Sequence, residues 1–198
     1  MTTLSHDFFD RHPVEVAREL LGRLLVRRTT EGSVSGRIVE VEAYLFEDDP
    51  ACHATRGQTR SNRAMFGPPG RAYVYPIHSR FCLNAVTERE GVASAVLVRA
   101  VDPVDGIELM RSRRRREKLV DLTRGPGRLC EAFQIDRRLD RYDLAIGRRL
   151  WISQFNHAEP TQSEIGRSRR IGVTSGSELQ LRFFLISNPF VSGPRRLR

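Results

Sequence analysis

Residues 36–45, GRIVEVEAYL, decide the fold of this chain because their side chains alternate strictly in character. A period of two is the pattern of a β-strand, in which successive side chains point to opposite faces. One face carries Val39, Val41 and Ala43, which suit a hydrophobic core. The other face carries Ile38, Glu40, Glu42 and Tyr44, and two acids with a tyrosine are a poor composition for a core. We therefore predict a strand with one apolar and one polar face.

The segments around this strand contain both helix and strand signals. Pro13 suits the first position of a helix, Gly22 suits its end, and an apolar segment follows directly. The order of elements predicts an α+β fold, a mostly antiparallel curved sheet with flanking helices, in a single domain over residues 1–198. The basic end at about 194–198 is expected to be a mobile tail. Further strands are expected in 24–28, 71–77, 93–101, 150–155 and 179–187, and helices in 105–118, capped by Asp105, and from 125 onwards.

The charge of the chain indicates a polyanionic partner. Lysine and arginine number 33 against 24 aspartates and glutamates, which gives a formal net charge of +9. Such a balance attracts nucleic acid. An arginine-rich genome would produce the same charge without a nucleic-acid role, so charge alone leaves both explanations open.

Composition and cysteine usage exclude several classes of protein. The apolar stretches are too short to span a bilayer, and the first residues lack the pattern of a secretion signal. Cys52, Cys82 and Cys130 are odd in number and far apart, which favours free thiols in a reducing compartment. No spacing of ligand residues is typical of a metal site. We expect a cytoplasmic monomer without cofactor or metal, associated with the nucleoid if it is bacterial.

Two glutamates on the polar face of the strand are candidate catalytic groups. Glu40 and Glu42 lie two residues apart, which separates their Cβ atoms by about 6.5–7 Å. Paired carboxylates near that separation hydrolyse glycosidic bonds, one activating water and the other assisting. Two glutamates on a strand are more often solvated or paired with arginine. Glu42 is favoured because Tyr44 and a long polar loop containing His53 follow it.

Arg99 lies within an apolar predicted strand, between Val98 and Ala100. A buried arginine requires a partner, and a carboxylate is the natural one. Glu42 and Glu40 are both candidates. The pair is either structural, or it keeps a catalytic glutamate ionised.

Aromatic and imidazole groups accumulate in the same part of the sequence. In a basic protein such a cluster suits base stacking, worth about 1–3 kcal/mol per base. Alternation places Tyr73 and Tyr75 on the same side of their strand, where they could instead be ordinary core or cross-strand partners. The cluster comprises Tyr44, His53, Tyr73, Tyr75, His78 and Phe81.

The scarcity of lysine bears on the type of chemistry. A glycosylase that also cuts the DNA strand needs an amine to form a Schiff base with the sugar. The only lysine is Lys118, inside a basic run that is typical of a helix surface. A water-attacking enzyme that leaves the strand intact is therefore favoured.

Several motifs in one order carry a family resemblance. GRIVEVEAYL is followed by CHATRG, SNRAMFGPPG, RAYVYPIHSRFCLN, SAVLVRAVDP, RGPGRLCEAF and RIGV, and then by LRFFLISNPFVSG. This series resembles the alkyladenine (3-methyladenine, or methylpurine) DNA glycosylase family. The resemblance runs from about Leu4 to Gly193, which is nearly the whole chain.

The resemblance implies roles for three groups around a water molecule. Glu42 matches the general base that deprotonates the attacking water. Arg99 matches the arginine that holds this glutamate and the water. The carbonyl of Val173 matches a second contact to the water.

The resemblance also implies how a damaged base is held. Asn84 matches the residue that disfavours the 2-amino group of normal guanine. His78 falls where better-known members have a tyrosine that fills the gap left by the extruded nucleotide, so an imidazole here is a departure. The groups that match the walls around the flipped base are Tyr44, His53 and Tyr75.

The resemblance implies base-excision repair. The expected enzyme is a monofunctional DNA-3-methyladenine glycosylase that binds double-stranded DNA, flips out an alkylated purine and leaves an abasic site. We expect 3-methyladenine and 7-methylguanine to be released more readily than hypoxanthine or ethenoadenine. The alternative is a non-catalytic module that binds damaged DNA or RNA.

Overall fold

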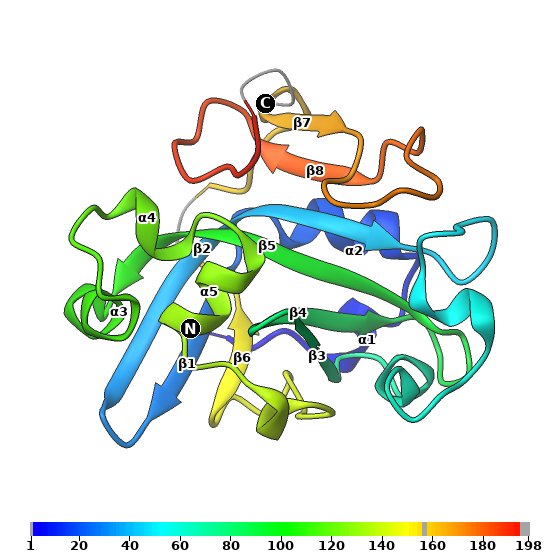
Figure 1. Cartoon of the computed structure of the whole chain (residues 1–198), viewed down its shortest axis with the longest axis horizontal. Helices are drawn as coiled ribbons and strands as arrows, with labels where there is room; N and C mark the ends of the chain where they lie inside the picture. Colours follow the sequence, from blue (N-terminus) through cyan, green and yellow to red (C-terminus); the bar gives the residue numbers. More distant parts are fainter. Residues whose placement is uncertain (1, 156–157, 195–198) are drawn as a thin grey trace.

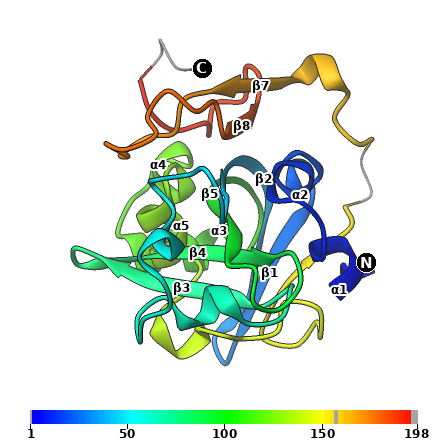
Figure 2. The ribbon, with the colours of Figure 1, turned by 90° about the vertical axis from the view of Figure 1, so that its right-hand side faces the viewer.

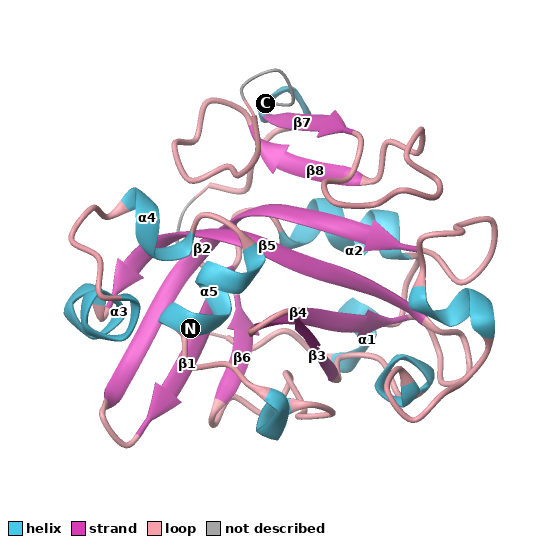
Figure 3. Ribbon diagram, in the orientation of Figure 1, coloured by secondary structure: helices cyan, strands magenta, loops and turns pink. Residues whose placement is uncertain are grey.

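The computed structural model describes residues 2–155 and 158–194. The predicted basic tail at 194–198 therefore lies outside the described residues, apart from Pro194. Within them, eight strands form one antiparallel sheet with short helices around it, as the α+β prediction requires (Figures 1 and 3). None of the described helices is long and apolar enough to cross a membrane.

The sheet is built around the strand predicted from GRIVEVEAYL, which is β2. One edge of β2 pairs with β5, and the other edge is shared between β1 and β8. The order is β3-β4-β5-β2-β1-β6, with β7 bound to β8 outside this path. The β7–β8 pair thus lies over the rest of the sheet, beside the half of β2 that carries the glutamates (Figure 2). The strands are β1 (Leu24–Thr29), β2 (Gly32–Tyr44), β3 (Ala72–Ile77), β4 (Arg80–Thr87), β5 (Ser94–Asp105), β6 (Leu150–Ser153), β7 (Ile165–Ser168) and β8 (Arg182–Leu185).

Two β-bulges interrupt the pairing of β2 with β5 beside the glutamates. The register leaves Val39 as an extra residue on β2 and Arg99 as an extra residue on β5. A bulge bends its strand and redirects a side chain. The strict alternation predicted for β2 is therefore wrong here, because Ile38 and Val39 both join the core. The polar face of β2 is also buried, since Glu40 and Glu42 have no exposed surface.

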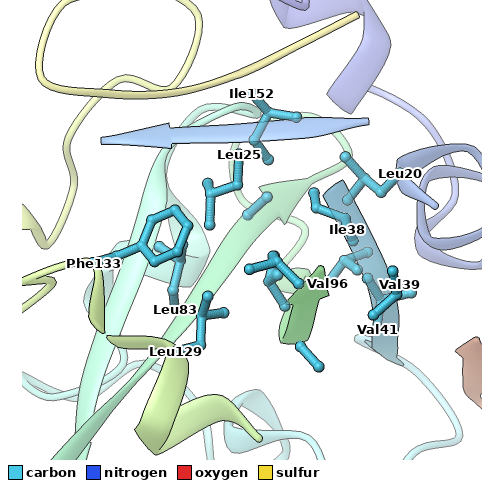
Figure 4. Close-up of a cluster of buried hydrophobic side chains, with 14 of the residues drawn as sticks. Leu20, Leu25, Ile38, Val39, Val41, Leu83, Val96, Leu129, Phe133 and Ile152 are labelled. Atoms are coloured by element: carbon cyan, nitrogen blue, oxygen red, sulfur yellow. The ribbon is translucent and has the colours of Figure 1, made fainter. Parts of the chain in front are cut away.

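The hydrophobic core lies between the sheet and the helices that cover it. Leu20 from the second helix and Leu129 from the fifth point towards side chains of the strands, among them Leu83 and Val96 (Figure 4). Phe133, directly after the fifth helix, is also fully buried in this cluster. Packing against this core fixes the position of β2. The C-terminal end of β2, which carries Glu42, contributes to the site described below.

The helices are short, and the second and fifth follow the sequence prediction, whereas the first and fourth were not predicted. Pro13 occupies the first turn of the second helix, as predicted. The third helix begins later and ends earlier than expected. Its N-cap is Gly106, with a left-handed φ of +71°, instead of Asp105, and the helix stops before Arg115, where φ is +49°. The helices are α1 (His6–Phe9), α2 (Pro13–Leu20), α3 (Ile107–Arg114), α4 (Val120–Thr123) and α5 (Pro126–Ala132), with 3-10 turns at His53–Arg56, Arg63–Phe66, Arg137–Leu139 and Gln162–Glu164.

Candidate active site

Glu42 lies near the end of β2 with both carboxylate oxygens in use. Its Oε1 accepts a hydrogen bond from the backbone N–H of Ile171 (2.7 Å) and lies 3.0 Å from Nη1 of Arg99. Its Oε2 accepts a hydrogen bond from the hydroxyl of Tyr44 (2.9 Å). A carboxylate has about four acceptor sites, so these three donors leave capacity for one more. The arrangement suits an ionised carboxylate that binds and orients a water molecule.

Arg99 bridges the two glutamates. The sequence left open which of them pairs with Arg99, and the structure shows that both do. Its Nε donates to Oε1 of Glu40 at 2.9 Å, while Nη1 faces Glu42. The bulge at Arg99 turns the side chain out of the apolar strand and towards this pair. Burial lowers the pKa of Arg99, but the charges of Glu42 and Glu40 outweigh burial and raise it above its ordinary value. The guanidinium therefore remains charged.

Glu40 is occupied by structural contacts. Its Oε1 accepts from Arg99, from Nε of Arg182 (2.7 Å) and from the hydroxyl of Ser192 (2.9 Å), and its Oε2 accepts from the Ser192 N–H (2.6 Å). Burial raises the pKa of Glu40, but the charges of Arg99 and Arg182 outweigh burial and hold it below its ordinary value. Glu40 thus anchors Arg99, and its contacts do not fit the second acid of a carboxylate pair.

A cavity of about 450 Å³ lies next to Glu42. Tyr44 and Val173 line it. Tyr44 itself contacts Glu42, and Val173 lies two residues after Ile171, whose N–H also contacts Glu42. The cavity brings together five of the eight residues predicted for the site. These are Tyr44, His53, Tyr75, Asn84 and Val173, and the wall is completed by Pro50, Ala51, Met65, Tyr73, Pro76, Ile77, Gly172, Thr174 and Ser175.

Three aromatic groups form one packed wall of the cavity. The rings of His53 and Tyr75 meet edge to face, with centroids 4.7 Å apart, and the rings of Tyr73 and Tyr75 are 5.3 Å apart. Nδ1 of His53 lies 2.9 Å from the hydroxyl of Tyr73. Burial lowers the pKa of His53 below its ordinary value of 6.5, so the imidazole is neutral at pH 7. Tyr73 and Tyr75 both line the cavity, and Tyr73 also holds His53 in place.

Asn84 is fixed at the floor of the site by the sheet. It lies opposite Tyr73 in the pairing of β3 with β4, and its side-chain amide donates to the Tyr73 carbonyl at 3.0 Å. Only 3% of Asn84 is exposed. Its orientation is therefore set by the strand pair, and its remaining polar atoms are available to the cavity.

His78 lies at the exposed tip of the β3–β4 hairpin and does not line the cavity. It is the first residue of the two-residue turn and has a left-handed φ of +52°. The hairpin extends beyond the body of the domain (Figure 2). Its neighbour Ile77 is 43% exposed and does line the cavity, a position that no sequence pattern predicts.

A buried ion pair at the edge of the site was not predicted from the sequence. Nη1 and Nη2 of Arg170 each donate to an oxygen of Asp49 at 2.6 Å. The guanidinium lies over the ring of Tyr44, 4.6 Å from its centroid. Arg170 is one of several arginines in 167–170, and no pattern distinguishes it from its neighbours.

The geometry combines a polar group for water with a slot for a flat ring. Glu42 and its three donors form the polar end, and the neutral aromatic wall forms the slot. Within residues 2–155 and 158–194, no group of three histidine, cysteine or carboxylate side chains is placed to hold a metal ion. The donor set at Glu42 consists of an arginine, a hydroxyl and a backbone N–H, and such groups stabilise a carboxylate directly.

Comparison with known proteins identifies relatives along nearly the whole chain. A family model described as "Methylpurine-DNA glycosylase (MPG)" matches residues 7–189. A protein of Mesorhizobium japonicum is 48% identical over 184 residues, which cover 92% of this chain and 86% of the relative. A protein of Methanocella arvoryzae is 45% identical over 197 residues, which cover 97% of this chain and 96% of the relative. Both carry the name "Putative 3-methyladenine DNA glycosylase".

Proposed function

Because this chain belongs to the methylpurine-DNA glycosylase family, we propose that it uses Glu42 to activate the water that hydrolyses the glycosidic bond of a damaged purine. The chain is a DNA glycosylase of DNA repair. The observation that carries the proposal is the setting of Glu42. It is a buried carboxylate with three donors and spare acceptor capacity, next to an aromatic cavity.

The target nucleotide must leave the duplex to reach Glu42. Extrusion costs a few kcal/mol, and least for a damaged or mispaired base. Stacking of the purine against Tyr44, His53 and Tyr75 offsets this cost, at about 1–3 kcal/mol per stacked base. The cavity volume of about 450 Å³ lies within the range of small-ligand sites. Asn84 faces the purine edge in this arrangement and disfavours the 2-amino group of guanine.

Hydrolysis then proceeds through an oxocarbenium-like sugar. The bond from the sugar carbon to the purine nitrogen breaks, and its electron pair leaves with the base. Glu42 stabilises the cationic sugar and accepts a proton from the water whose oxygen bonds to that carbon. The carbonyl of Val173 accepts a hydrogen bond from the water's other O–H, which stays on the sugar as a hydroxyl, and Arg99 holds Glu42 in position. The products are the free base and an abasic site in an intact strand.

The site favours purines that are good leaving groups without help. A base alkylated at N3 of adenine or N7 of guanine is already cationic and departs as a neutral molecule. Hypoxanthine and ethenoadenine are neutral and need a proton, yet burial keeps His53 unprotonated at neutral pH. We therefore expect 3-methyladenine and 7-methylguanine to be released faster than either neutral lesion.

Strand cleavage is not part of the proposed reaction. Lys118 is exposed and does not line the cavity, so it offers no amine to the sugar. DNA treated with the enzyme should break at the abasic site only after alkali, and borohydride should trap no adduct at Lys118. A trapped adduct would contradict hydrolysis by water.

Replacing Glu42 with glutamine tests the proposal. Duplexes that each carry one defined lesion are incubated with wild type and with Glu42→Gln, and free base is measured under single-turnover conditions. We expect the variant to lose at least about 100-fold in rate, the usual scale for general-base catalysis. Glu108→Gln, on the exposed surface of α3, is the matched control and should retain the wild-type rate.

Circular dichroism must show that Glu42→Gln is folded. An unchanged rate in a folded variant would exclude Glu42 as the base. Binding of lesion DNA or RNA by wild type without any base release would favour a non-catalytic module.

A further inference from the structure

The segment that follows β7, residues 169–175, crosses the site without belonging to the sheet. Among the described residues, its backbone forms no hydrogen bond with the backbone of another segment. It nevertheless supplies two parts of the site. The N–H of Ile171 donates to Glu42, and Gly172 to Ser175 line the cavity. Some other contact must hold this segment in register with Glu42.

The contact with the best geometry is the pair between Arg170 and Asp49. Both side chains are fully buried, and the guanidinium and carboxylate meet through two parallel hydrogen bonds of 2.6 Å. Nη1 also donates to the carbonyl of Ala43, at 3.0 Å. Burial lowers the pKa of Arg170, but the hydrogen bonds that it donates to Asp49 and the charge of Asp49 outweigh burial and raise the pKa. Two-point contact of this kind fixes orientation as well as distance.

Asp49 extends the contact to a second segment that lines the cavity. It accepts the backbone N–H of Leu45 with Oδ2 and that of Ala51 with Oδ1, both at 3.1 Å. The loop held in this way contributes Pro50 and Ala51 to the cavity. One ion pair therefore joins two segments that both line the cavity, residues 169–175 and the loop with Pro50 and Ala51.

Arg170 also supports the ring of Tyr44. Its guanidinium carbon lies 4.6 Å from the ring centroid, while the hydroxyl of the same ring donates to Glu42. A cation over an aromatic face is attracted to it, and more strongly when water is excluded. The ring is thus fixed at its face and at its hydroxyl, in the position where a purine would stack.

We propose that Arg170, through its paired contact with Asp49, is a positioning residue that sets both the base slot and the water site of this glycosylase. The inference rests on the proposed function of Glu42. Arg170 touches neither base nor water in this scheme. It aligns Ile171 and Tyr44, which contact Glu42, and it holds together the two segments that line the cavity. Misplacement of a reacting group by about 1 Å can cost about 100-fold in rate.

The test compares Arg170→Met with Arg114→Met. Arg114 is also a buried arginine paired with a carboxylate, Glu131. This pair joins the end of α3 to α5, and Arg114 does not line the cavity. Each variant is assayed for single-turnover release of 3-methyladenine and for affinity towards a duplex with an abasic-site analogue. Both assays are run below the melting temperature of every variant.

We expect Arg170→Met to release base about 100-fold more slowly, while its affinity for the abasic duplex changes less than about threefold. Arg114→Met should stay within about threefold of wild type in both assays. Arg170→Lys restores the charge without the paired contact, and we expect it to recover less than a tenth of the lost rate. Equal rates for Arg170→Met and Arg114→Met, or full recovery by Arg170→Lys, would overturn the positioning role.

Asp49→Asn keeps the inference testable if Arg170→Met does not fold. It retains the shape of Asp49 and removes its charge, and the expected pattern is the same slow release with near-normal abasic binding. A wild-type rate for Asp49→Asn would contradict the proposal. Absence of base release by the wild-type chain would instead overturn the proposed function, and the two failures are therefore distinct.

Discussion

Tyr44 joins three parts of the site through one side chain. Its hydroxyl donates to Glu42, its ring lies on Arg170, and it lines the cavity. Burial raises the pKa of Tyr44 well above its ordinary value, so the hydroxyl remains a donor. The contribution of the hydroxyl can therefore be measured separately from that of the ring by replacing Tyr44 with phenylalanine.

Tyr44→Phe should slow base release and leave binding intact. A hydrogen bond to a charged group contributes about 1.5–3 kcal/mol, which corresponds to roughly ten- to a hundredfold in rate. Single-turnover release of 3-methyladenine measures the effect. Tyr142→Phe is the control, because Tyr142 uses its hydroxyl to accept from the Arg149 backbone and does not line the cavity. A Tyr44→Phe rate equal to wild type would mean that the hydroxyl does not assist Glu42.

Glu40 predicts a pH dependence of stability. Its pKa is lower in the folded chain than its ordinary value of 4.5. Its ionised form therefore stabilises the fold above about pH 4.5, and this contribution is lost as the pH falls through the folded-state value. Glu40→Gln leaves Arg99 and Arg182 without their shared carboxylate, which should cost about 3–5 kcal/mol at pH 7.

Urea unfolding at several pH values measures this difference. The gap between wild type and Glu40→Gln should be largest near neutral pH and should shrink below pH 4.5. Glu19→Gln is the control, since Glu19 forms an ion pair with Arg11 at the surface. A gap that stayed constant with pH would show that Glu40 stabilises the fold by means other than its charge.

The site residues that could be predicted from the sequence were those that differ in polarity from their immediate neighbours in the chain. Glu42, Tyr44 and Arg99 stood out because polar groups interrupt apolar strands. The structure adds Arg170 and Asp49, which are separated by 121 residues. A long-range pair between two charged residues in irregular segments leaves no periodic signal in one sequence.

At the scale of elements, the tip of the β3–β4 hairpin extends beyond the body of the domain (Figure 2). His78 and Ile77 lie at its tip, one in the turn and one on the cavity wall. Apolar side chains that insert between bases unstack the duplex and keep it open. Ile77 is an exposed apolar side chain of this kind. The family resemblance assigns the filling of the gap in the duplex to His78.

His78→Ala and Ile77→Ala should each weaken binding to a duplex with an abasic-site analogue by about three- to tenfold, because each removes contact that fills the gap in the duplex. Fluorescence anisotropy measures the affinity. Ile186→Ala is the control, because Ile186 is similarly exposed (50%) but lies beyond β8 and lines a different part of the surface. If only Ile77→Ala weakens binding, the role assigned to His78 is wrong.

The sequence predicted most strands but missed β4, β7 and both bulges. Residues 82–87 of β4 are buried on both faces, so the alternation that identifies a half-exposed strand is absent. The bulges depend on how β2 and β5 pair, which neither strand specifies alone. They allow Arg99 to reach Glu42, so the geometry of the candidate site depends on a feature that local pattern does not encode.

At the scale of the whole molecule, the charge of +9 predicts salt-sensitive binding to undamaged DNA. Each phosphate contact adds about −0.9 to the slope of log affinity against log salt. Arg56 is exposed in the loop beside the aromatic wall and lines a neighbouring cavity. Arg56→Gln should weaken binding and reduce the magnitude of the slope by about one.

Affinity for an undamaged duplex, measured from low to physiological salt, tests this prediction. Arg148→Gln is the matched control, because Arg148 is exposed and lines neither of the two cavities. The same loss of slope in both variants would mean that the charge acts as a diffuse field instead of through the loop at the site.

The contact of Ser192 with Glu40 has a consequence for synthesis of the chain. Glu40 and its partners Arg99, Arg182 and Ser192 come from distant parts of the sequence. During translation, Glu40 and Arg99 leave the ribosome long before Ser192 does. The carboxylate of Glu40 therefore cannot make all its contacts until the segment with Ser192 has left the ribosome.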